Sequence, residues 1–241
     1  VKGEVPVNIL GYGGWLTLLL LSAHVALRLL APYADPVLLP VVAALNGLGL
    51  AVIYRIDLSR GNDVGGLAQQ QLIWMTLGVA LFIATLWLVS DHRLLQRFTY
   101  TAALAAVVLL LLPMVPGLGF SNYGARIWIR IAGLTFQPGE VAKVLLVIAF
   151  AGYLVRHRDA LALAGRRVLF IDFPRGRDLG PILVIWLISL GILAAQRDLG
   201  SALLFFGIFL VMLYVATERA GWLVVGATLF GLMAASALAT A

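Results

Sequence analysis

Two short segments hold most of the polar residues whose types and spacing could support chemistry. The first runs from Gly124 to Lys143 and reads GARIWIRIAGLTFQPGEVAK, and the second, QRDLGS, runs from Gln196 to Ser201. Long apolar stretches adjoin both segments. Because an ionisable group is costly inside a bilayer, an ionisable residue beside a membrane span is a functional candidate.

Lys143 and Asp198 are the candidates for an ion pair in a polar cavity. Lys143 lies roughly 8 Å past the start of a helix predicted to begin at Pro138. Asp198 directly precedes another apolar stretch. Each residue also has a structural interpretation, because a lysine amine can extend to the headgroups and an aspartate can cap the helix that follows it. A cap and an ion pair are compatible, since a carboxylate has several acceptor sites.

The start of the helix at Pro138 carries two further candidates for substrate binding. Gln137 fits the N-cap position and Pro138 the first helical position. Glu140 falls in the first turn, where the helix dipole favours a carboxylate, and it shares a face with Lys143. This pattern predicts a helix start whose polar side chains lie close to the first segment.

Arg126, Trp128 and Arg130 alternate along the chain, so an extended backbone would place all three on one face. One interpretation is an interfacial anchor, with tryptophan at headgroup depth and arginines on lipid phosphates. The other is capture of an anionic, lipid-linked substrate, because arginine binds phosphate bidentately. Both interpretations stay open.

The composition indicates a membrane protein. Apolar residues make up 62% of the chain and charged residues 12%, and the mean hydropathy is +1.02. A soluble domain of 241 residues cannot bury so much apolar surface. The chain has no cysteine, and its three histidines are far apart, which argues against a metal cluster built on either. The net charge of +6 fits cytoplasmic loops, and no nucleic acid partner is expected.

We predict an all-α fold, a polytopic transmembrane bundle of about eight membrane-spanning helices, since each span needs about 20 apolar residues. The expected spans are 9–31, 36–54, 69–90, 98–115, 138–155, 180–195, 201–216 and 221–241. One membrane domain over residues 1–241 would contain them all. The chain begins with valine and ends inside an apolar stretch, so we expect a piece of a longer protein.

The arginines predict which side of the membrane each connection faces. Segment 156–179 contains six arginines and is expected in the cytoplasm. Alternation of the spans then places segments 116–137 and 196–200 on the outer side. It also places Asp57 and Asp63 there, in a loop that we expect to be polar.

Three motifs resemble the shape, elongation, division and sporulation family, the RodA and FtsW proteins. They are GARxWI from Gly124, FQPxExAK ending at Lys143, and DLGSA from Asp198. Their order and their spacing through the intervening spans also agree. The resemblance covers roughly residues 45–241, with a family-like core from about 36 to 241. The helix at about 9–31 resembles an N-terminal extension of actinobacterial type.

The resemblance implies a multi-pass enzyme of the bacterial cytoplasmic membrane, a glycosyltransferase that polymerises lipid-linked disaccharide-pentapeptide (lipid II) into peptidoglycan strands. It implies a class B penicillin-binding protein as partner, and a divalent cation, Mg²⁺ or Mn²⁺. It also implies that Lys143 and Asp198 pair within a central cavity. Duties in cell elongation, as for RodA, and in division, as for FtsW, are both open.

The chain departs from the family pattern in two ways. Gly139, Arg197 and Ser201 stand where members usually have serine, proline and threonine. The family's proposed catalytic aspartate, in an outer-loop motif resembling His-Thr-Asp-Phe, has no counterpart in this sequence and is expected beyond Ala241. We therefore expect no catalytic residue within the chain, which as an N-terminal portion would be inactive alone.

Two other functions stay open at the level of the sequence. Charges near an outer cavity would also suit a transporter that moves lipid II across the membrane. A chain without its catalytic group could instead be a non-catalytic scaffold of the cell-wall synthesis complex. A catalytic acid or base at the outer face would distinguish the enzyme from both.

Overall fold

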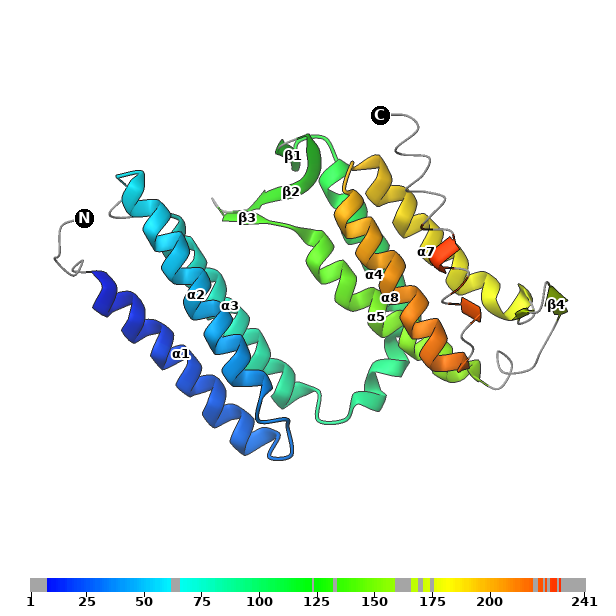
Figure 1. Cartoon of the computed structure of the whole chain (residues 1–241), viewed down its shortest axis with the longest axis horizontal. Helices are drawn as coiled ribbons and strands as arrows, with labels where there is room; N and C mark the ends of the chain where they lie inside the picture. The colour runs from blue at the N-terminus through cyan, green and yellow to red at the C-terminus, as the bar shows by residue number, and fades with distance from the viewer. Residues whose placement is uncertain are drawn as a thin grey trace. The chain divides into compact units, whose positions relative to one another are not determined.

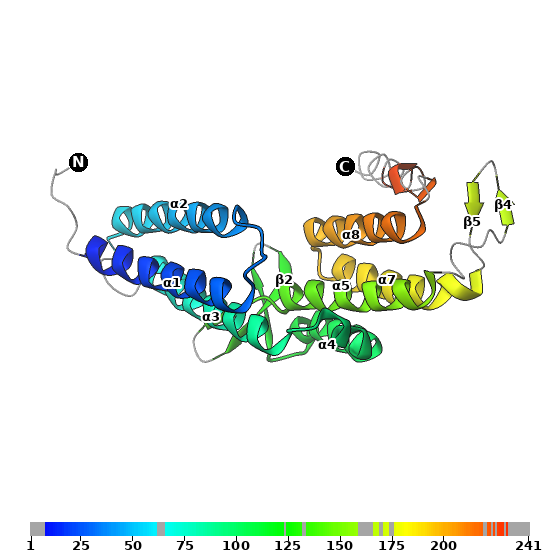
Figure 2. The same cartoon turned by 90° about the horizontal axis from the view of Figure 1, so that it is seen from below.

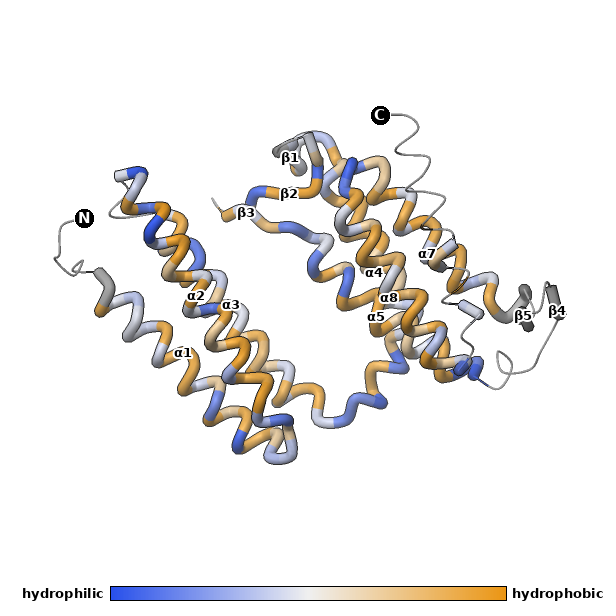
Figure 3. Tube along the Cα trace, viewed as in Figure 1, coloured by the Kyte–Doolittle hydropathy of each residue, from blue (hydrophilic) through white to orange (hydrophobic). Residues whose placement is uncertain are grey.

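The structure is a computed structural model. It describes residues 8–61, 66–122, 124–131, 134–158, 166–168, 171–173 and 176–218, and also 221–222, 224, 226–228 and 230. The chain divides into two compact units, residues 1–91 and 92–241 (Figure 1). Both units are built mainly from helices along which apolar residues predominate (Figure 3).

Six helices in the described part of the chain are long and apolar enough to cross a membrane. They are Leu10–Leu30, Leu38–Ser59, Leu67–Leu88, His92–Met114, Pro138–Arg156 and Leu199–Thr217. A shorter apolar helix covers Leu179–Ala195. These helices correspond to the first seven predicted spans and confirm the polytopic helical fold. The eighth, 221–241, falls largely outside the described residues.

The first unit contains α1 (Asn8–Leu30), α2 (Leu38–Ser59) and α3 (Leu67–Leu88). Helix α3 packs against both other helices, whereas α1 and α2 contact each other at few residues. Figure 2 shows the ribbons of α1 and α2 separated from each other over most of their length. The small core of this unit is formed by Leu50, Ala68 and Leu72, with Tyr12 and Tyr54 in edge-to-face contact beside it.

Asp57 connects the end of α2 to the start of α3. It lies in the last turn of α2 and is only 2% exposed. Its Oδ2 accepts a hydrogen bond of 2.7 Å from the main-chain N–H of Ala68, one of the N–H groups that a helix start leaves unpaired. A Cβ at Gly66 would lie 2.5 Å from Oδ2, so glycine leaves room for the carboxylate. The predicted placement of Asp57 in a polar loop is wrong, because the residue is a buried helix cap.

The helices of the second unit follow a short 3-10 helix, η1 (His92–Phe98). They are α4 (Thr99–Leu111), α5 (Pro138–Arg156), α7 (Gly176–Ala195) and α8 (Leu199–Thr217), with a second 3-10 turn, η2 (Leu112–Met114), after α4. Helices α4 and α5 pack extensively against each other. Small buried residues face each other there, and a Cβ at Gly152 would lie 2.1 Å from Thr99 Oγ1. Such small residues let membrane helices approach closely.

An aromatic cluster holds α5, α7 and α8 together. The ring of Phe209 is stacked on Trp186 at 4.6 Å between centroids and meets Phe150 edge-to-face at 5.3 Å. Phe150 and Phe209 are almost completely buried. Such ring pairs stabilise a core beyond the area that they bury.

Two small antiparallel sheets interrupt the helices of the second unit. The first has the order β1 (Gly119–Asn122), β2 (Ala125–Ile131) and β3 (Leu134–Phe136), and it lies between α4 and α5 in the chain. The second pairs β4 (Arg166–Val168) with β5 (Ile171–Phe173) inside the arginine-rich segment. The sequence did not predict either sheet, although it raised an extended backbone for Arg126–Arg130.

Candidate functional site

The two polar segments meet at one end of the second unit. The main-chain N–H of Arg126 in β2 donates to the carbonyl oxygen of Gln196, in the turn between α7 and α8, over 3.2 Å. Gln196 is 3% exposed, and its Nε2 donates to the carbonyl oxygen of Leu110 near the end of α4. One buried residue thus connects the sheet, α4 and the α7–α8 turn. The sequence showed a polar residue directly after an apolar span, but no role was assigned to Gln196.

One face of the three-stranded sheet packs against η2, the 3-10 turn that follows α4. Ile129 in β2 is 2% exposed, and its partner in the register is Gly119 in β1. A Cβ at Gly119 would lie 1.7 Å from the carbonyl oxygen of Pro113. Only glycine therefore allows β1 to approach Pro113 so closely. With Ile129 buried on this side, the other face of β2 is turned away from the helices.

The opposite face of β2 carries Arg126, Trp128 and Arg130, as alternation along a strand requires. Both arginines are exposed and Trp128 is partly buried. Trp128 is paired in the register with Phe120, and the guanidinium of Arg130 lies 5.0 Å from the centroid of the Phe120 ring. Among the described residues neither arginine forms a salt bridge. The guanidinium of Arg126 donates to the carbonyl oxygen of Gly119 over 3.5 Å and, being exposed, keeps other N–H groups available. Two exposed guanidiniums on one face of a strand can bind a phosphate or pyrophosphate group.

Helix α5 begins as the sequence predicts. Pro138 occupies the first helical position after Gln137, which stands at the N-cap without a capping side-chain hydrogen bond. Lys143 Nζ lies 3.0 Å from both carboxylate oxygens of Glu140. The side chain of Lys143 is 22% exposed and that of Glu140 is 59% exposed. In this structure Glu140 is therefore the partner of Lys143.

Asp198 caps α8, which confirms the capping interpretation. Its Oδ1 accepts a hydrogen bond of 3.0 Å from the main-chain N–H of Ser201. Its Oδ2 is buried and has no hydrogen-bond partner in the described part of the chain. The structure does not form the Lys143–Asp198 ion pair that the resemblance implies. That pair stays a prediction, and Asp198 has one acceptor atom still available for it.

The residue before Asp198 has an unusual backbone conformation. Arg197 has φ 60°, in the left-handed region, and its N–H donates to the carbonyl oxygen of Ala194 over 3.0 Å. Proline, which family members usually have at this position, has φ near −65° and no N–H. The turn between α7 and α8 in this chain is therefore one that proline could not adopt.

Metal coordination has no evident site in the part of the chain that the structure describes. No three side chains from among histidine, aspartate and glutamate are grouped there as ligands for an ion. A divalent cation usually needs several oxygen donors, and Asp198 Oδ2 alone does not supply them. The cation therefore stays a prediction from the resemblance.

Comparison with known proteins connects these motifs to one family. The family model for cell cycle proteins of the FtsW, RodA and SpoVE type matches residues 36–241. The chain belongs to this family. As a member with six candidate spans in its described part, it is a multi-pass protein of the bacterial cytoplasmic membrane.

The curated relatives of this FtsW/RodA-family chain are peptidoglycan glycosyltransferases. It is 45% identical over 231 residues to the peptidoglycan glycosyltransferase RodA of Mycobacterium tuberculosis, which covers 94% of this chain and 49% of the relative. The corresponding RodA of Mycobacterium leprae is 44% identical over 225 residues, covering 91% and 47%. A probable peptidoglycan glycosyltransferase FtsW of Trichlorobacter lovleyi is 29% identical over 194 residues, covering 79% and 47%. The chain spans about half the length of the curated relatives it matches.

Solved structures of the family are also similar to the chain. The crystal structure of Thermus thermophilus rod shape determining protein RodA is 27% identical, with a TM-score of 0.43, over 92% of this chain and 58% of that one. A structure of a peptidoglycan synthase complex that coordinates polymerization and crosslinking is 28% identical, with a TM-score of 0.44, over 95% and 53%.

Proposed function

We propose that this chain is part of a peptidoglycan glycosyltransferase of the RodA/FtsW type, which polymerises lipid II during cell elongation or division. The observation that carries the proposal is the 45% identity with the mycobacterial RodA enzymes over 94% of this chain. The family match over residues 36–241 supports the same assignment.

The exposed face of β2 is the proposed binding site for the pyrophosphate of lipid II. Arg126 and Arg130 would each bind phosphate oxygens, with the Trp128 ring between them. The buried Ile129 and the hydrogen bond from Arg126 N–H to Gln196 hold this strand against the helices. Gln137 and Glu140, at the start of α5, follow directly after the sheet and are proposed to contact the sugar or its linkage.

Lys143 and Asp198 are proposed to pair in the complete enzyme. Two features support the proposal: Lys143 Nζ lies on a flexible side chain beside Glu140, and Asp198 Oδ2 is buried without a partner among the described residues. An acceptor in that state gains free energy from a cationic partner. The pair would position the α7–α8 turn relative to α5.

The proposal also concerns parts of the enzyme outside this chain: its catalytic group, its protein partner and its metal ion. Sugar transfer needs an acid or base at the reacting sugar, and we propose that this group lies beyond Ala241. The full-length protein is proposed to act with a class B penicillin-binding protein. It is also proposed to need Mg²⁺ or Mn²⁺.

The test measures polymer from lipid II with the purified full-length protein, its penicillin-binding partner and a divalent cation. Arg126→Gln together with Arg130→Gln should raise the KM for lipid II by about 100-fold, about tenfold for each charge-assisted phosphate contact that is lost. Arg60→Gln removes another exposed arginine, in the first unit, and is the matched control. Glycan strands should appear with wild type and control, and not with residues 1–241 alone.

Three outcomes would overturn the proposal. Polymer made by residues 1–241 alone would mean that the catalytic group lies within this chain. Movement of lipid II across vesicle membranes without polymer would favour a transporter. Neither activity in the full-length protein, when it is folded and bound to its partner, would favour a scaffold.

A further inference from the structure

A cavity of about 460 Å³ opens between α1 and the start of α2 in the first unit. Most of its lining is apolar, including Leu20, Leu21, Leu39 and Ala43. The cavity lies within the volume range of about 300–1,000 Å³ that small-molecule sites occupy. It exists because α1 and α2 both pack against α3 and hardly contact each other.

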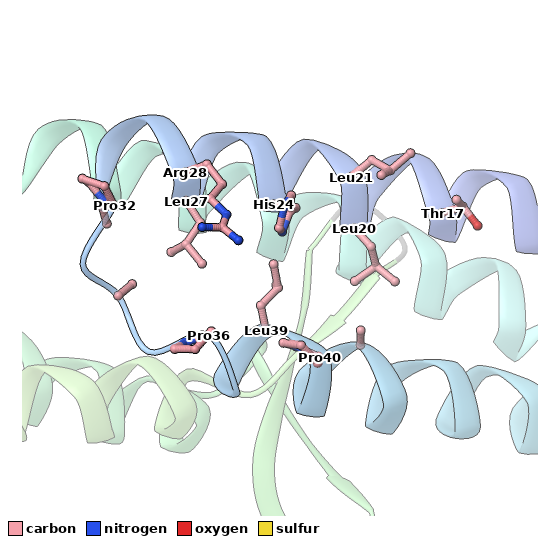
Figure 4. A pocket seen from close by; sticks show the side chains of 13 residues that line it. Thr17, Leu20, Leu21, His24, Leu27, Arg28, Pro32, Pro36, Leu39 and Pro40 are labelled. Atoms are coloured by element: carbon pink, nitrogen blue, oxygen red, sulfur yellow. The ribbon is translucent and has the colours of Figure 1, made fainter.

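Two nitrogen-bearing side chains line this cavity, Arg28 near the α1–α2 connection and His24 near the middle of the lining of α1. His24 and Arg28 lie one helical turn apart on α1, and Figure 4 shows both pointing towards the space near Pro36 and Leu39. Both side chains are exposed, and neither has a hydrogen bond or ion pair with any residue that the structure describes. A polar side chain inside a membrane span normally has a partner.

The nearest acidic residue in the α1–α2 connection does not supply that partner. Asp35 Oδ1 accepts a hydrogen bond of 2.8 Å from the N–H of Val37, at the start of α2. Asp35 contributes to the lining of a second cavity, not to that of the first. The end of the first cavity therefore has a net positive charge from Arg28.

The second cavity continues this mostly apolar space towards α3, with Asp35, Asn46 and Gln71 as the polar members of its lining. It has a volume of about 470 Å³ and shares Leu20, Leu27 and Leu39 with the first. Trp74, Gly78 and Phe82 of α3 form its floor. A charged end followed by a long apolar space has the chemistry of an anionic lipid, with a phosphate at one end and a hydrocarbon chain at the other.

We propose that the space between α1 and α2 binds one anionic phospholipid of the cytoplasmic leaflet, with its phosphate at Arg28 and His24. An acyl chain would lie along Leu20 and Leu39 towards the floor on α3. Basic pockets between membrane helices on the cytoplasmic side bind anionic headgroups, and the arginine distribution places Arg28 on that side. Charge complementarity favours a lipid over a second apolar helix, which would leave His24 and Arg28 without partners.

The test is native mass spectrometry of the purified full-length protein with added phosphatidylglycerol or phosphatidylcholine. Phosphatidylglycerol should remain bound to wild type, and Arg28→Gln should lower its retention by about fivefold, the typical contribution of one basic side chain at an anionic surface. Arg60→Gln, at the other end of α2, removes the same charge away from the cavity and should have no effect. Arg28→Lys should keep most of the retention.

A second variant tests the hydrocarbon part of the site. Ala43→Trp keeps both nitrogen-bearing side chains and fills the cavity, so it should also displace phosphatidylglycerol. Thermal unfolding checks that each variant is folded. If Arg28→Gln does not fold, Arg28→Lys and Ala43→Trp still test the charged and the apolar part of the site. Four results would overturn the proposal. Wild type could retain phosphatidylglycerol and phosphatidylcholine equally, or Arg28→Gln could retain as much phosphatidylglycerol as wild type. Inorganic phosphate alone could displace the lipid, or a protein dimer could form in place of the lipid complex.

Discussion

Arg197 and Asp198, which are adjacent, each have an energetically unfavourable feature. Arg197 has a left-handed backbone conformation, which is unfavourable for a residue with a Cβ. Asp198 caps α8 with one carboxylate oxygen and buries the other without a partner in the described part of the chain. Unfavourable features of this kind are retained where the surrounding structure fixes them, often at functional sites.

Arg197→Gly should stabilise the protein by about 0.5–1 kcal/mol, because relief of the left-handed strain outweighs the extra freedom of glycine in the unfolded chain. Arg197→Pro should destabilise it, since proline cannot adopt φ 60° and loses the hydrogen bond to Ala194. Thermal unfolding in detergent measures both changes. Arg60→Gly is the control, because Arg60 has φ −93° and gains nothing from glycine. A more stable Arg197→Pro variant would contradict this account of the turn.

A double-mutant cycle tests whether Lys143 and Asp198 interact in the full-length enzyme. Asp198→Asn is preferable to Asp198→Ala, because asparagine keeps an oxygen that can cap α8 while removing the charge. Lys143→Met and Asp198→Asn should each reduce activity strongly, and the double variant should lose less than the sum. A second cycle with Glu140→Gln and Lys143→Met measures the coupling of Lys143 to the partner that it has in this structure. Strict additivity between Lys143→Met and Asp198→Asn would exclude the pair.

Local features of these residues could be predicted from the sequence, whereas their distant partners could not. The helix start at Pro138 and the cap at Asp198 depend on residues within one turn, so short motifs reveal them. The hydrogen bonds of Gln196 join it to Leu110 and Arg126, which are far away in the chain. Asp57 was misplaced for the same reason, because its partner is in the next helix.

At the scale of elements, small residues determine how closely α4 and α5 pack. Alanines at 102, 103, 106, 142 and 149 are buried in this region, and Gly152 lies against Thr99. The apolar stretches predicted the two helices. The three-stranded sheet between them was not predicted, because its short strands have a weak pattern and pack against η2, the turn that follows α4.

Gly152→Val should separate α4 from α5 and destabilise the protein by about 1–3 kcal/mol, because its Cβ has no space beside Thr99 Oγ1. Gly191→Val in α7 is the matched control, since a Cβ there has no heavy atom within 4 Å. Thermal unfolding should show a large loss for the first variant and a small loss for the second. Equal losses would mean that helix propensity, rather than the close contact, explains both.

At the scale of the whole molecule, the distribution of arginine predicts the orientation of the chain in the membrane. The outer side should carry the β1–β2–β3 sheet and the α7–α8 turn, which the structure places in contact through Arg126 and Gln196. This contact requires that both segments lie on the same side, as alternation of the spans predicts.

Single cysteines can report this orientation, because residues 1–241 contain none and any cysteine elsewhere in the full-length protein can be replaced by serine. Ser121→Cys, exposed in β1, should react with an impermeant thiol reagent in intact cells, and His92→Cys, exposed in η1, should react only after the membrane is opened. Both substitutions are made in the full-length protein. Labelling of residue 92 with protection of residue 121 would reverse the topology.

The hydrogen bond between Asp57 and Ala68 also has a consequence for biogenesis. The N-terminal part of the chain is synthesised first, so α2 is complete while the N–H group that Asp57 needs is still inside the ribosome. A carboxylate without its partner opposes burial of that end of α2. We therefore expect α2 and α3 to enter the bilayer together as a helical hairpin, with insertion of the first helix completed only after the second has begun to emerge.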